Sequence, residues 1–598
     1  TNLVDGPTGD IVRALGGAIP QDPFSYNVFL NFEPTNEAEN KGLSLDADFD
    51  LDWAGLKSIT ALRSSEIVRD GDVDFNSADL IGSNAQFLEI ETFTQELRLT
   101  SQTDGPISWI LGGFYFDESI KQGDSISFGT QFRPYADFLT GAPGTIGGVE
   151  ASLGFAPGTF FRPGDGVFEF ATQENESYSV FAQADWELSD RLTATVGVSY
   201  LNDQKEVTLN QLNTDVFSQL DFAGQDGFNS LVVQGIAANF PNIALACTGT
   251  ALPFTPANVQ TVSGVGSCPF LPGTPPGALA FAGLQAQVTA GVSALDLSDP
   301  NQNPLLGLQA LQFLPQLLGF PNVGQDGRSD DSNTDYTIRL AYDLTDDINV
   351  YGSYSTGYKA TSWNLSRDSR PTPAERQAIL TSGGSLPNNL TTGTRFAGPE
   401  ESKVYELGVK GAYSDFAFNV AIFDQTIEGF QSNIFTGTGF ALANAGEQST
   451  QGLELDAQWN ATDNLLLSFA GTFLDPVYDS FEESASGDIS GQKPYGIPDV
   501  STSTSATYTF DVKTYDAFVR ADWQYESPSD YFDEPANQAL IGDEKEVSTF
   551  NASAGLTTES GLSFTLWGRN IFDDEYITPE KLSICLTRYL MASSCGSR

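Results

Sequence analysis

Residues 43–52 read Leu-Ser-Leu-Asp-Ala-Asp-Phe-Asp-Leu-Asp, with an apolar side chain at every odd position and a polar one at every even position. Side chains of a β-strand alternate between its two faces, so this segment predicts a strand with one apolar and one strongly acidic face. A water-soluble sandwich could use such a strand once, but the chain repeats the pattern about sixteen times. The repeats predict an all-β fold, a large transmembrane β-barrel with lipid outside and an aqueous lumen inside.

The connections between the repeats alternate in length. Sixteen strands of about ten residues are predicted between residues 43 and 570, long enough to cross a hydrocarbon band of about 25 Å when tilted. Short connections such as 188–191 are followed by long ones such as 204–332. One rim should therefore carry short periplasmic turns and the other long extracellular loops, as in an antiparallel up-and-down barrel. Rings at both ends of an apolar face, as at Tyr178 and Trp186, fit the girdles at membrane interfaces.

The 204–332 connection is the longest predicted loop. Its apolar stretch 304–321 is bounded by proline, which predicts short helices folded over the barrel mouth. A lid or ligand-contact role and a self-packed surface excursion are both open interpretations of this loop. The chain contains no uninterrupted run of eighteen apolar residues, which predicts that no helix spans a membrane.

The composition is strongly acidic. The 598 residues include 28 Lys and Arg against 78 Asp and Glu, a formal net charge of −50. Such an anion should repel nucleic acid, so no nucleic-acid partner is expected. Aromatic residues make up 12% of the chain, which argues against acidic disorder. The chain starts at Thr1 without a signal peptide, so either a leader was removed or the sequence begins within a longer protein.

Rows of carboxylates on the predicted strands are interpreted as lumen wall. The lumen-facing candidates are Asp46, Asp48, Asp50, Glu454 and Asp456. Rows of this kind meet water, a plug or a passing cation rather than forming acid–base pairs. The chain also has no His, no G-x-S-x-G elbow and no P-loop, so no catalytic residue is predicted and the protein is not expected to be an enzyme. The sequence identifies no ligand-binding residue.

A metal site is considered at one acidic loop. Asp70-Gly-Asp72-Val-Asp74-Phe-Asn76 resembles the front half of a calcium loop with oxygen ligands at alternate positions. The glycine at the sixth position and the glutamate at the twelfth are missing, so an EF-hand is not expected. A solvated acidic loop is the main interpretation, and Ca²⁺ held by Asp70, Asp72 and Asp74 is the alternative. No other cofactor is expected.

Four cysteines are present, and two of them suggest a pair. Cys247 and Cys268 lie in one polar, Pro- and Gly-rich stretch. Zinc prefers tighter Cys/His spacing, so a disulfide closing a surface loop in an oxidising compartment is predicted, with two free thiols as the alternative.

Four segments resemble the barrel of TonB-dependent outer-membrane receptors. They cover about residues 40–577 and occur in the order found in that family: 94–99 with 109–116, 350–359, 399–410 with 452–455, and 567–576, which reads Trp-Gly-Arg-Asn-Ile-Phe-Asp-Asp-Glu-Tyr. The last is similar to the near-terminal N-[LI]-F-D-x-x-Y signature of the family.

The resemblance implies a function, a location and an organisation. It implies uptake of a scarce nutrient such as an iron–siderophore, cobalamin or a saccharide across the outer membrane of a Gram-negative bacterium. The implied partners are outer-membrane lipid, the TonB complex and the small-molecule nutrient. We expect a loop-like start at 1–42, the barrel at 43–577 and an atypical C-terminal tail at 578–598.

The resemblance also implies that parts of such a receptor are missing. The barrels of that family have 22 strands with a plug and a TonB box in front. The sequence therefore predicts an incomplete or altered receptor, and no residue is assigned to the TonB contact. A passive porin-like channel and a structural protein that assembles through open strand edges are the alternatives.

Overall fold

The computed structural model describes residues 7–19, 27–74, 76–102, 105–141, 143–312, 314, 319, 321–322, 326–365, 377, 381, 395–435, 440–444, 446–482, 488–531 and 544–576. The predicted tail at 578–598 lies outside these residues.

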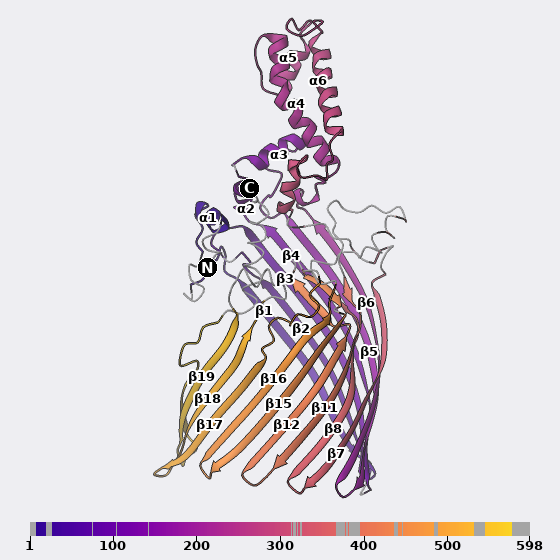
Figure 1. Ribbon diagram of the computed structural model, residues 1–598, viewed down its shortest axis with the longest axis vertical. Helices are drawn as coiled ribbons and strands as arrows, with labels where there is room; N and C mark the ends of the chain where they lie inside the picture. The colour runs from indigo at the N-terminus through magenta and orange to yellow at the C-terminus, as the bar shows by residue number, and fades with distance from the viewer. Residues whose placement is uncertain are drawn as a thin grey trace.

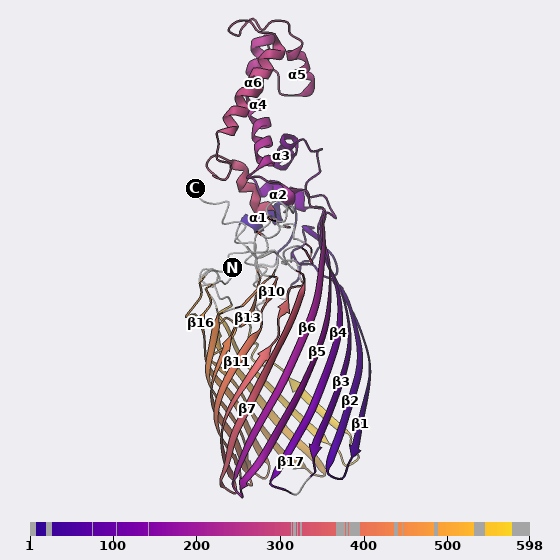
Figure 2. The same cartoon turned by 90° about the vertical axis from the view of Figure 1, so that its right-hand side faces the viewer.

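One antiparallel sheet of 16 strands dominates the described residues, and each strand pairs with the next along the chain. The strands are β1 (Thr35–Asp50), β2 (Ala54–Asp70), β3 (Ile81–Ser101), β4 (Ile107–Phe128), β5 (Gly166–Ser189), β6 (Leu192–Asn213), β7 (Arg328–Thr345), β8 (Ile348–Lys359), β11 (Glu400–Ala412), β12 (Phe416–Glu428), β15 (Glu447–Thr462), β16 (Leu465–Ser480), β17 (Val500–Val512), β18 (Tyr515–Ser529), β19 (Lys545–Thr557) and β20 (Ser563–Gly568). The sheet curls about its long axis, with short turns at one rim and long connections at the other (Figures 1 and 2). The predicted fold class and its sixteen strands are confirmed.

Two small ribbons accompany the main sheet on the side of the long connections. They are β9 (Ser362–Trp363) with β10 (Phe396–Ala397) and β13 (Gln431–Phe435) with β14 (Phe440–Asn444). In the main sheet, β1 and β20 stand at the two ends of the strand order, and the described strands show no pairing between them.

The predicted loop-like start was wrong in two places. β1 begins at Thr35, and Pro7–Ala14 forms helix α1. Residues 35–42 are almost entirely polar, so they lack the alternation that identifies a strand in sequence. They become a strand because they pair with the end of β2, from Thr35 opposite Asp70 to Gly42 opposite Arg63.

The register places one continuous apolar face along the sheet. Ala184, Val196 and Ile338 lie opposite one another in adjacent strands. Val196 is 57% exposed and Ile338 is 52% exposed, so no second layer among the described residues covers them. Other exposed apolar side chains on this face are Leu45, Leu97, Leu111, Val180, Leu340, Leu407, Ile422, Val519 and Leu566. A sheet that leaves such a face uncovered along its whole width suits contact with lipid.

A compact region, here called the cap, lies on the rim with the long connections. It contains α1, α2 (Phe132–Leu139), α3 (Thr145–Leu153), and the short 3₁₀ helices η1 (Phe217–Gln219) and η2 (Pro304–Leu311). Its buried rings are Phe128, Phe132, Tyr135, Phe160, Phe161, Phe217 and Phe222. The ring centroids of Phe161 and Phe217 are 4.6 Å apart, so the β4–β5 and β6–β7 connections share one aromatic core.

Three further helices, here called the arm, project from the cap away from the barrel (Figures 1 and 2). They are α4 (Gln225–Thr248), α5 (Pro256–Ser263) and α6 (Gly277–Ser293). Phe240 and Ala244 of α4, Val262 of α5 and Leu284 of α6 form a second, smaller core. Gly235 allows α4 and α6 to approach closely, because a Cβ at this position would overlap Val288.

The arm differs from what was predicted for the long loop. The short helix predicted within 304–321 exists as η2, but the longer helices α4 and α6 were not predicted. By length and composition, α4 is apolar enough to cross a membrane, although the sequence has no uninterrupted run of eighteen apolar residues. Asn, Gln and Pro residues interrupt its apolar run in sequence without interrupting the helix.

Candidate functional site: the lumen wall and the extracellular cap

The face opposite the apolar one is polar, and it carries the acidic row of β1. Asp46, Asp48 and Asp50 alternate with exposed apolar residues of the same strand. The Nζ atom of Lys57 on β2 lies 3.0 Å from Asp46 Oδ2 and 3.5 Å from Asp48 Oδ2. Both carboxylates are exposed and Lys57 is half-buried, so the row is a hydrated, partly neutralised wall rather than a buried ion pair.

The second acidic pair lies on the same polar face, several strands away. Glu454 and Asp456 of β15 alternate with Leu453 and Leu455, and Asp456 lies opposite Asn419 of β12. The five acidic residues therefore belong to two separate places on one face, not to one constellation. Their contact with a lumen remains a prediction.

A cluster that sequence reasoning missed lies on the polar face near Glu454. The Tyr351 hydroxyl donates a hydrogen bond to Glu406 Oε1 at 2.6 Å. The guanidinium carbon of Arg339 is 4.3 Å from the Tyr351 ring centroid, and Lys410 Nζ is 5.4 Å from it. Two cations and a carboxylate around one ring can contact polar or charged groups of a molecule in the lumen. A lone tyrosine in a strand gives no signal for such a cluster, because its partners come from β7 and β11.

A glycine lies beneath the ring of this cluster. Gly408 lies directly opposite Tyr351, and a Cβ at this position would overlap the ring. The ring therefore lies against the neighbouring strand instead of standing away from the wall. Three more cross-strand pairs on the polar face share this arrangement: Gly112 with Phe181, Gly452 with Phe423, and Gly555 with Phe518.

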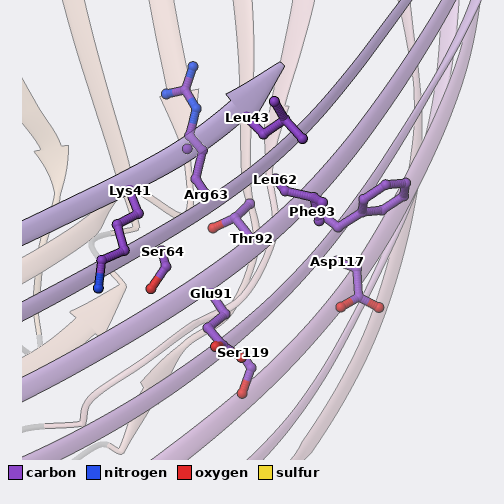
Figure 3. A pocket seen from close by; sticks show the side chains of 11 residues that line it. Lys41, Leu43, Leu62, Arg63, Ser64, Glu91, Thr92, Phe93, Asp117 and Ser119 are labelled. Carbon is purple, nitrogen blue, oxygen red and sulfur yellow. The ribbon is translucent and has the colours of Figure 1, made fainter. Parts of the chain in front are cut away.

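A groove of about 580 Å³ lies across β1 to β4 (Figure 3). Leu43, Leu62 and Phe93 line it from the apolar face, since they lie opposite one another in adjacent strands. Lys41 and Glu91 line it next to these residues, where the same face becomes polar. The ring centroids of Phe93 and Tyr115 are 6.2 Å apart at this height. This groove thus belongs to the aromatic boundary of the lipid-facing band and not to the lumen.

The carboxylates of the candidate calcium loop accept hydrogen bonds from backbone N–H groups. Asp70 Oδ1 accepts a hydrogen bond from the Asn84 backbone N–H at 2.8 Å, and Asp72 Oδ2 accepts one from the Asn31 N–H at 2.9 Å. Asp74 Oδ2 accepts one from the Ile81 N–H at 2.9 Å. Within the described residues, no group of three or more His, Cys, Asp or Glu side chains is arranged to hold a metal. The predicted solvated loop was wrong at Asp72 and Asp74, which are buried because their hydrogen bonds order the chain between β2 and β3.

The cap is fixed by an ion pair as well as by its rings. Arg133 Nη1 is 2.7 Å from Glu150 Oε1, and the Phe160 N–H donates to the same oxygen at 2.8 Å. Burial alone would raise the pKa of Glu150, but these bonds and one from the Gly158 N–H outweigh it and lower the pKa. The carboxylate is thus held ionised between α3 and the chain that follows it.

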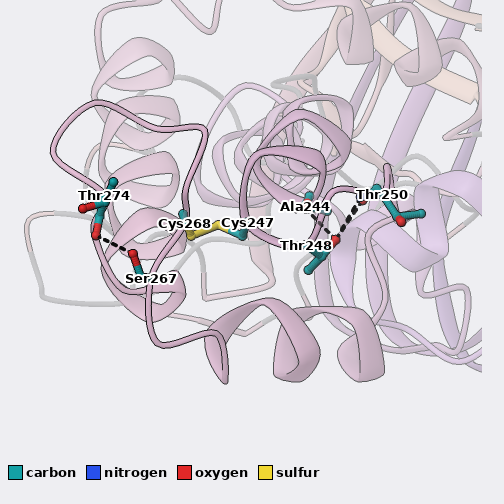
Figure 4. Close-up of a disulfide and its surroundings, with 7 residues drawn as sticks. All are labelled: Ala244, Cys247, Thr248, Thr250, Ser267, Cys268 and Thr274. Carbon is teal, nitrogen blue, oxygen red and sulfur yellow. Dashed lines mark hydrogen bonds between the residues drawn. A yellow bond between two sulfur atoms is a disulfide. The ribbon is translucent and has the colours of Figure 1, made fainter.

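Cys247 and Cys268 are joined by a disulfide within the arm (Figure 4). Cys247 lies at the end of α4 and Cys268 between α5 and α6. The Cys268 N–H donates to the Pro275 carbonyl at 2.8 Å, which orders the same turn. The disulfide therefore closes an extracellular helical loop rather than a loop at the membrane.

The fold and its long loops define a class: large antiparallel barrels of the outer membrane. The sequence matches the family described as TonB dependent receptor-like, beta-barrel, over residues 2–236 and 307–571. The chain belongs to this family, and its predicted outer-membrane location is confirmed by that membership. The unmatched residues 237–306 fall largely within the arm.

Individual relatives are distant. The pesticin receptor of Yersinia pestis is 24% identical over 271 residues, which cover 45% of this chain and 35% of that protein. The ferric yersiniabactin uptake receptor FyuA from Yersinia pestis superposes with a TM-score of 0.56 at 14% identity, covering 91% of this chain and 57% of FyuA. The siderophore receptor PiuA from Acinetobacter baumannii gives a TM-score of 0.53 at 14% identity, with 94% and 65% covered. The chain thus spans about a third of the curated relative's length, and less than two thirds of either solved receptor.

Proposed function

We propose that this chain forms the barrel of an outer-membrane receptor for TonB-dependent uptake of a scarce nutrient, with iron–siderophores as the first candidate class. Membership in the receptor family carries this proposal. The similar proteins support the nutrient class, since they include a ferric yersiniabactin uptake receptor and a siderophore receptor. The proposal includes no catalytic role.

The structure supports the proposal through the arrangement of its parts. The cap covers part of the extracellular rim with a folded core. The polar face carries the Tyr351 cluster near the opposite rim, because Tyr351 lies three residues after β8 begins at the tight β7–β8 turn. A ligand captured at the extracellular rim would meet the hydroxyl, carboxylate and cationic groups of this cluster only after passing along most of the wall. In this proposal the TonB complex supplies the energy, and no residue of this chain is assigned to the TonB contact.

Uptake in a receptor-deficient Gram-negative strain tests the proposal. Cells expressing the protein should accumulate radioactive iron from ferric yersiniabactin or a ferric catecholate, and disruption of TonB should abolish the accumulation. Tyr351→Phe, which removes only the hydroxyl, should weaken uptake more than Tyr508→Phe on the apolar face. The two variants are matched because each loses one hydroxyl from a barrel strand.

Planar-bilayer conductance separates this proposal from the porin-like alternative. Near silence together with TonB-dependent uptake would support a receptor. A large steady current, together with uptake that does not depend on TonB, would instead establish a passive channel and contradict the proposal.

A further inference from the structure

Two arginines on the polar face of β2 have no carboxylate partner. Arg63 and Arg69 are both exposed, and among the residues that the structure describes neither forms an ion pair with Asp or Glu. The chain has 78 acidic residues against 28 basic ones, so carboxylates are not scarce. Other cations of the same face are paired, namely Arg98 with Glu96, Lys205 with Asp203 and Arg520 with Asp522. The positive charges of Arg63 and Arg69 are therefore uncompensated locally.

The register fixes the direction of the Arg63 side chain. Arg63 borders the groove of the apolar side (Figure 3), but it lies between Leu62 and Ser64, which belong to that side. Arg63 lies directly opposite Gly42 of β1, and a Cβ added at Gly42 would project from the polar face and lie 3.7 Å from Arg63 Cγ. The Arg63 side chain therefore extends over the polar face. Arg69 follows six residues later in the same strand, so it lies on the same face.

The side chains next to these arginines are uncharged. Thr92 of β3 lies opposite Arg63, and Arg69 lies between Asn36 of β1 and Gln86 of β3. Further neighbours on the polar face are Asn40, Ser44 and Ser65. Hydroxyl and amide groups can donate hydrogen bonds to an anion without repelling it. This part of the wall thus suits a negatively charged group.

The nearby carboxylates lie outside this part of the wall. Glu118 and Asp124 of β4 accept hydrogen bonds from Thr92 and Gln86, so they lie on the far side of β3 from the arginines. The acidic row of β1 begins at Asp46, which lies four residues from Gly42 toward the tight β1–β2 turn, about 13 Å along the strand. The arginines are therefore separated from both acidic groups.

The two arginines lie at successive heights below the extracellular rim. Arg69 lies one residue before β2 ends at Asp70, on the rim with the long connections (Figure 1). Arg63 lies six residues nearer to the opposite rim, about 20 Å along the strand. A molecule that enters from outside along this part of the wall would meet Arg69 first, then Arg63, and only afterwards the acidic row of β1.

We propose that Arg69 and Arg63 contact the ligand on the extracellular half of the wall and select iron chelates that carry net negative charge, an inference that rests on the proposed uptake of iron–siderophores. A guanidinium forms charge-assisted, bidentate hydrogen bonds with carboxylate or catecholate oxygens. A chelate without negative charge cannot compensate these cations. The two arginines thus favour the anionic class of chelates over the others.

Binding to the purified full chain in detergent tests the proposal. Quenching of tryptophan fluorescence is titrated with an anionic ferric tricatecholate and with a ferric trihydroxamate that has no net negative charge. The wild-type protein should bind the tricatecholate at least about tenfold more tightly. Arg63→Gln and Arg69→Gln should each weaken tricatecholate binding about tenfold and leave trihydroxamate binding unchanged. Arg63→Lys should recover part of the affinity, because it keeps the charge but not the planar fork.

Arg520→Gln is the matched control. Arg520 lies on the same polar face, but its Nε atom is 2.9 Å from Asp522 Oδ1, so its charge is already compensated. This variant should change tricatecholate affinity by less than about twofold. Retained heat-modifiable mobility in electrophoresis would establish that each variant is folded.

Three results would overturn the inference: equal affinity for the two chelates, arginine variants that bind the tricatecholate as the wild type does, or no binding of either chelate. Because this binding does not involve TonB, it is separable from the proposed uptake. Tricatecholate binding that depends on Arg63 and Arg69, without TonB-dependent uptake, would contradict the proposed function alone. TonB-dependent uptake with binding that does not depend on chelate charge would contradict this inference alone.

Discussion

The barrel wall exposes many of its apolar side chains, whereas the cap on the extracellular side buries its own. In the wall, Val196 and Leu407 are more than half exposed, while the neighbouring side chains point to the polar face. In the cap, Phe160 and Phe217 are completely buried in an aromatic core. The wall relies on lipid as its apolar surroundings, whereas the cap must build its own core in water. The same residue types therefore carry different energetic roles in the two regions.

The largest effect on stability should come from removing one buried ring from the core of the cap. Phe217→Ala should lower the free energy of unfolding of the cap by about 3–5 kcal/mol, because it leaves a cavity among buried rings. Limited proteolysis of the cap under increasing urea measures this loss. Phe270→Ala, at an exposed position of the arm, should change it by less than about 1 kcal/mol. Equal losses would contradict the contrast between buried and exposed rings.

The wall should tolerate a smaller apolar residue but not a charge on its lipid-facing side. Val196→Arg should cost about 2–4 kcal/mol of barrel stability if position 196 lies near the bilayer midplane. Thr195→Arg, the adjacent residue on the polar face, should cost much less. Urea-dependent folding into lipid vesicles compares the two variants, and similar costs would show that the assignment of faces is wrong.

The disulfide should stabilise the arm alone. Cys247→Ser opens a link between residues 21 positions apart and should cost about 3 kcal/mol of arm stability. The rate of proteolytic cleavage between α4 and α6 measures this change. Cys268→Ser and the double variant should give the same loss, since each breaks the same bond. A change in barrel stability would show that arm and wall are coupled.

A smaller, pH-dependent effect is expected where the cap meets the wall. Asp215 follows β6, and its burial raises the pKa of its carboxyl to about 6, although bonds from Ser218 and Phe217 act in the opposite direction. Ionisation is thus more costly in the folded state, so stability should fall as pH rises from about 4 to about 6 and stay low above that range. The total change should be about 2–3 kcal/mol.

Asp215→Asn tests this pH dependence. The variant should remove most of the loss measured by proteolysis of the cap between pH 5 and pH 8, because its amide does not ionise. A wild-type cap whose stability is the same at both values would contradict the expected ionisation.

The strands of the wall were predictable because their signal is local. Alternation such as that in residues 43–52 needs no knowledge of distant contacts, and tight turns fix the antiparallel order. The disulfide pairing of Cys247 with Cys268 could also be proposed from the sequence, because both lie in one connection. The polar beginning of β1 could not be predicted from the sequence, because residues 35–42 form a strand only by pairing with β2.

The candidate functional residues were less predictable. The acidic residues of the wall were identified, but the Tyr351 cluster was not, because Arg339, Glu406 and Lys410 come from other strands. The loop between β2 and β3 was predicted to be a solvated acidic loop, with Ca²⁺ as the alternative, but Asp72 and Asp74 are buried. Its aspartates alternate like metal ligands in sequence, yet Asp70, Asp72 and Asp74 accept bonds from backbone N–H groups.

The sequence by itself determined a large antiparallel barrel with an apolar and a polar face, because a two-residue period is a property of each strand alone. Only the tertiary structure decided that two long connections fold into a cap with a common aromatic core and into a projecting helical arm. The physical reason is that burial depends on which segments meet in space. Phe161 and Phe217 are separated in sequence by a whole hairpin. No sequence pattern therefore indicates that their rings share one core.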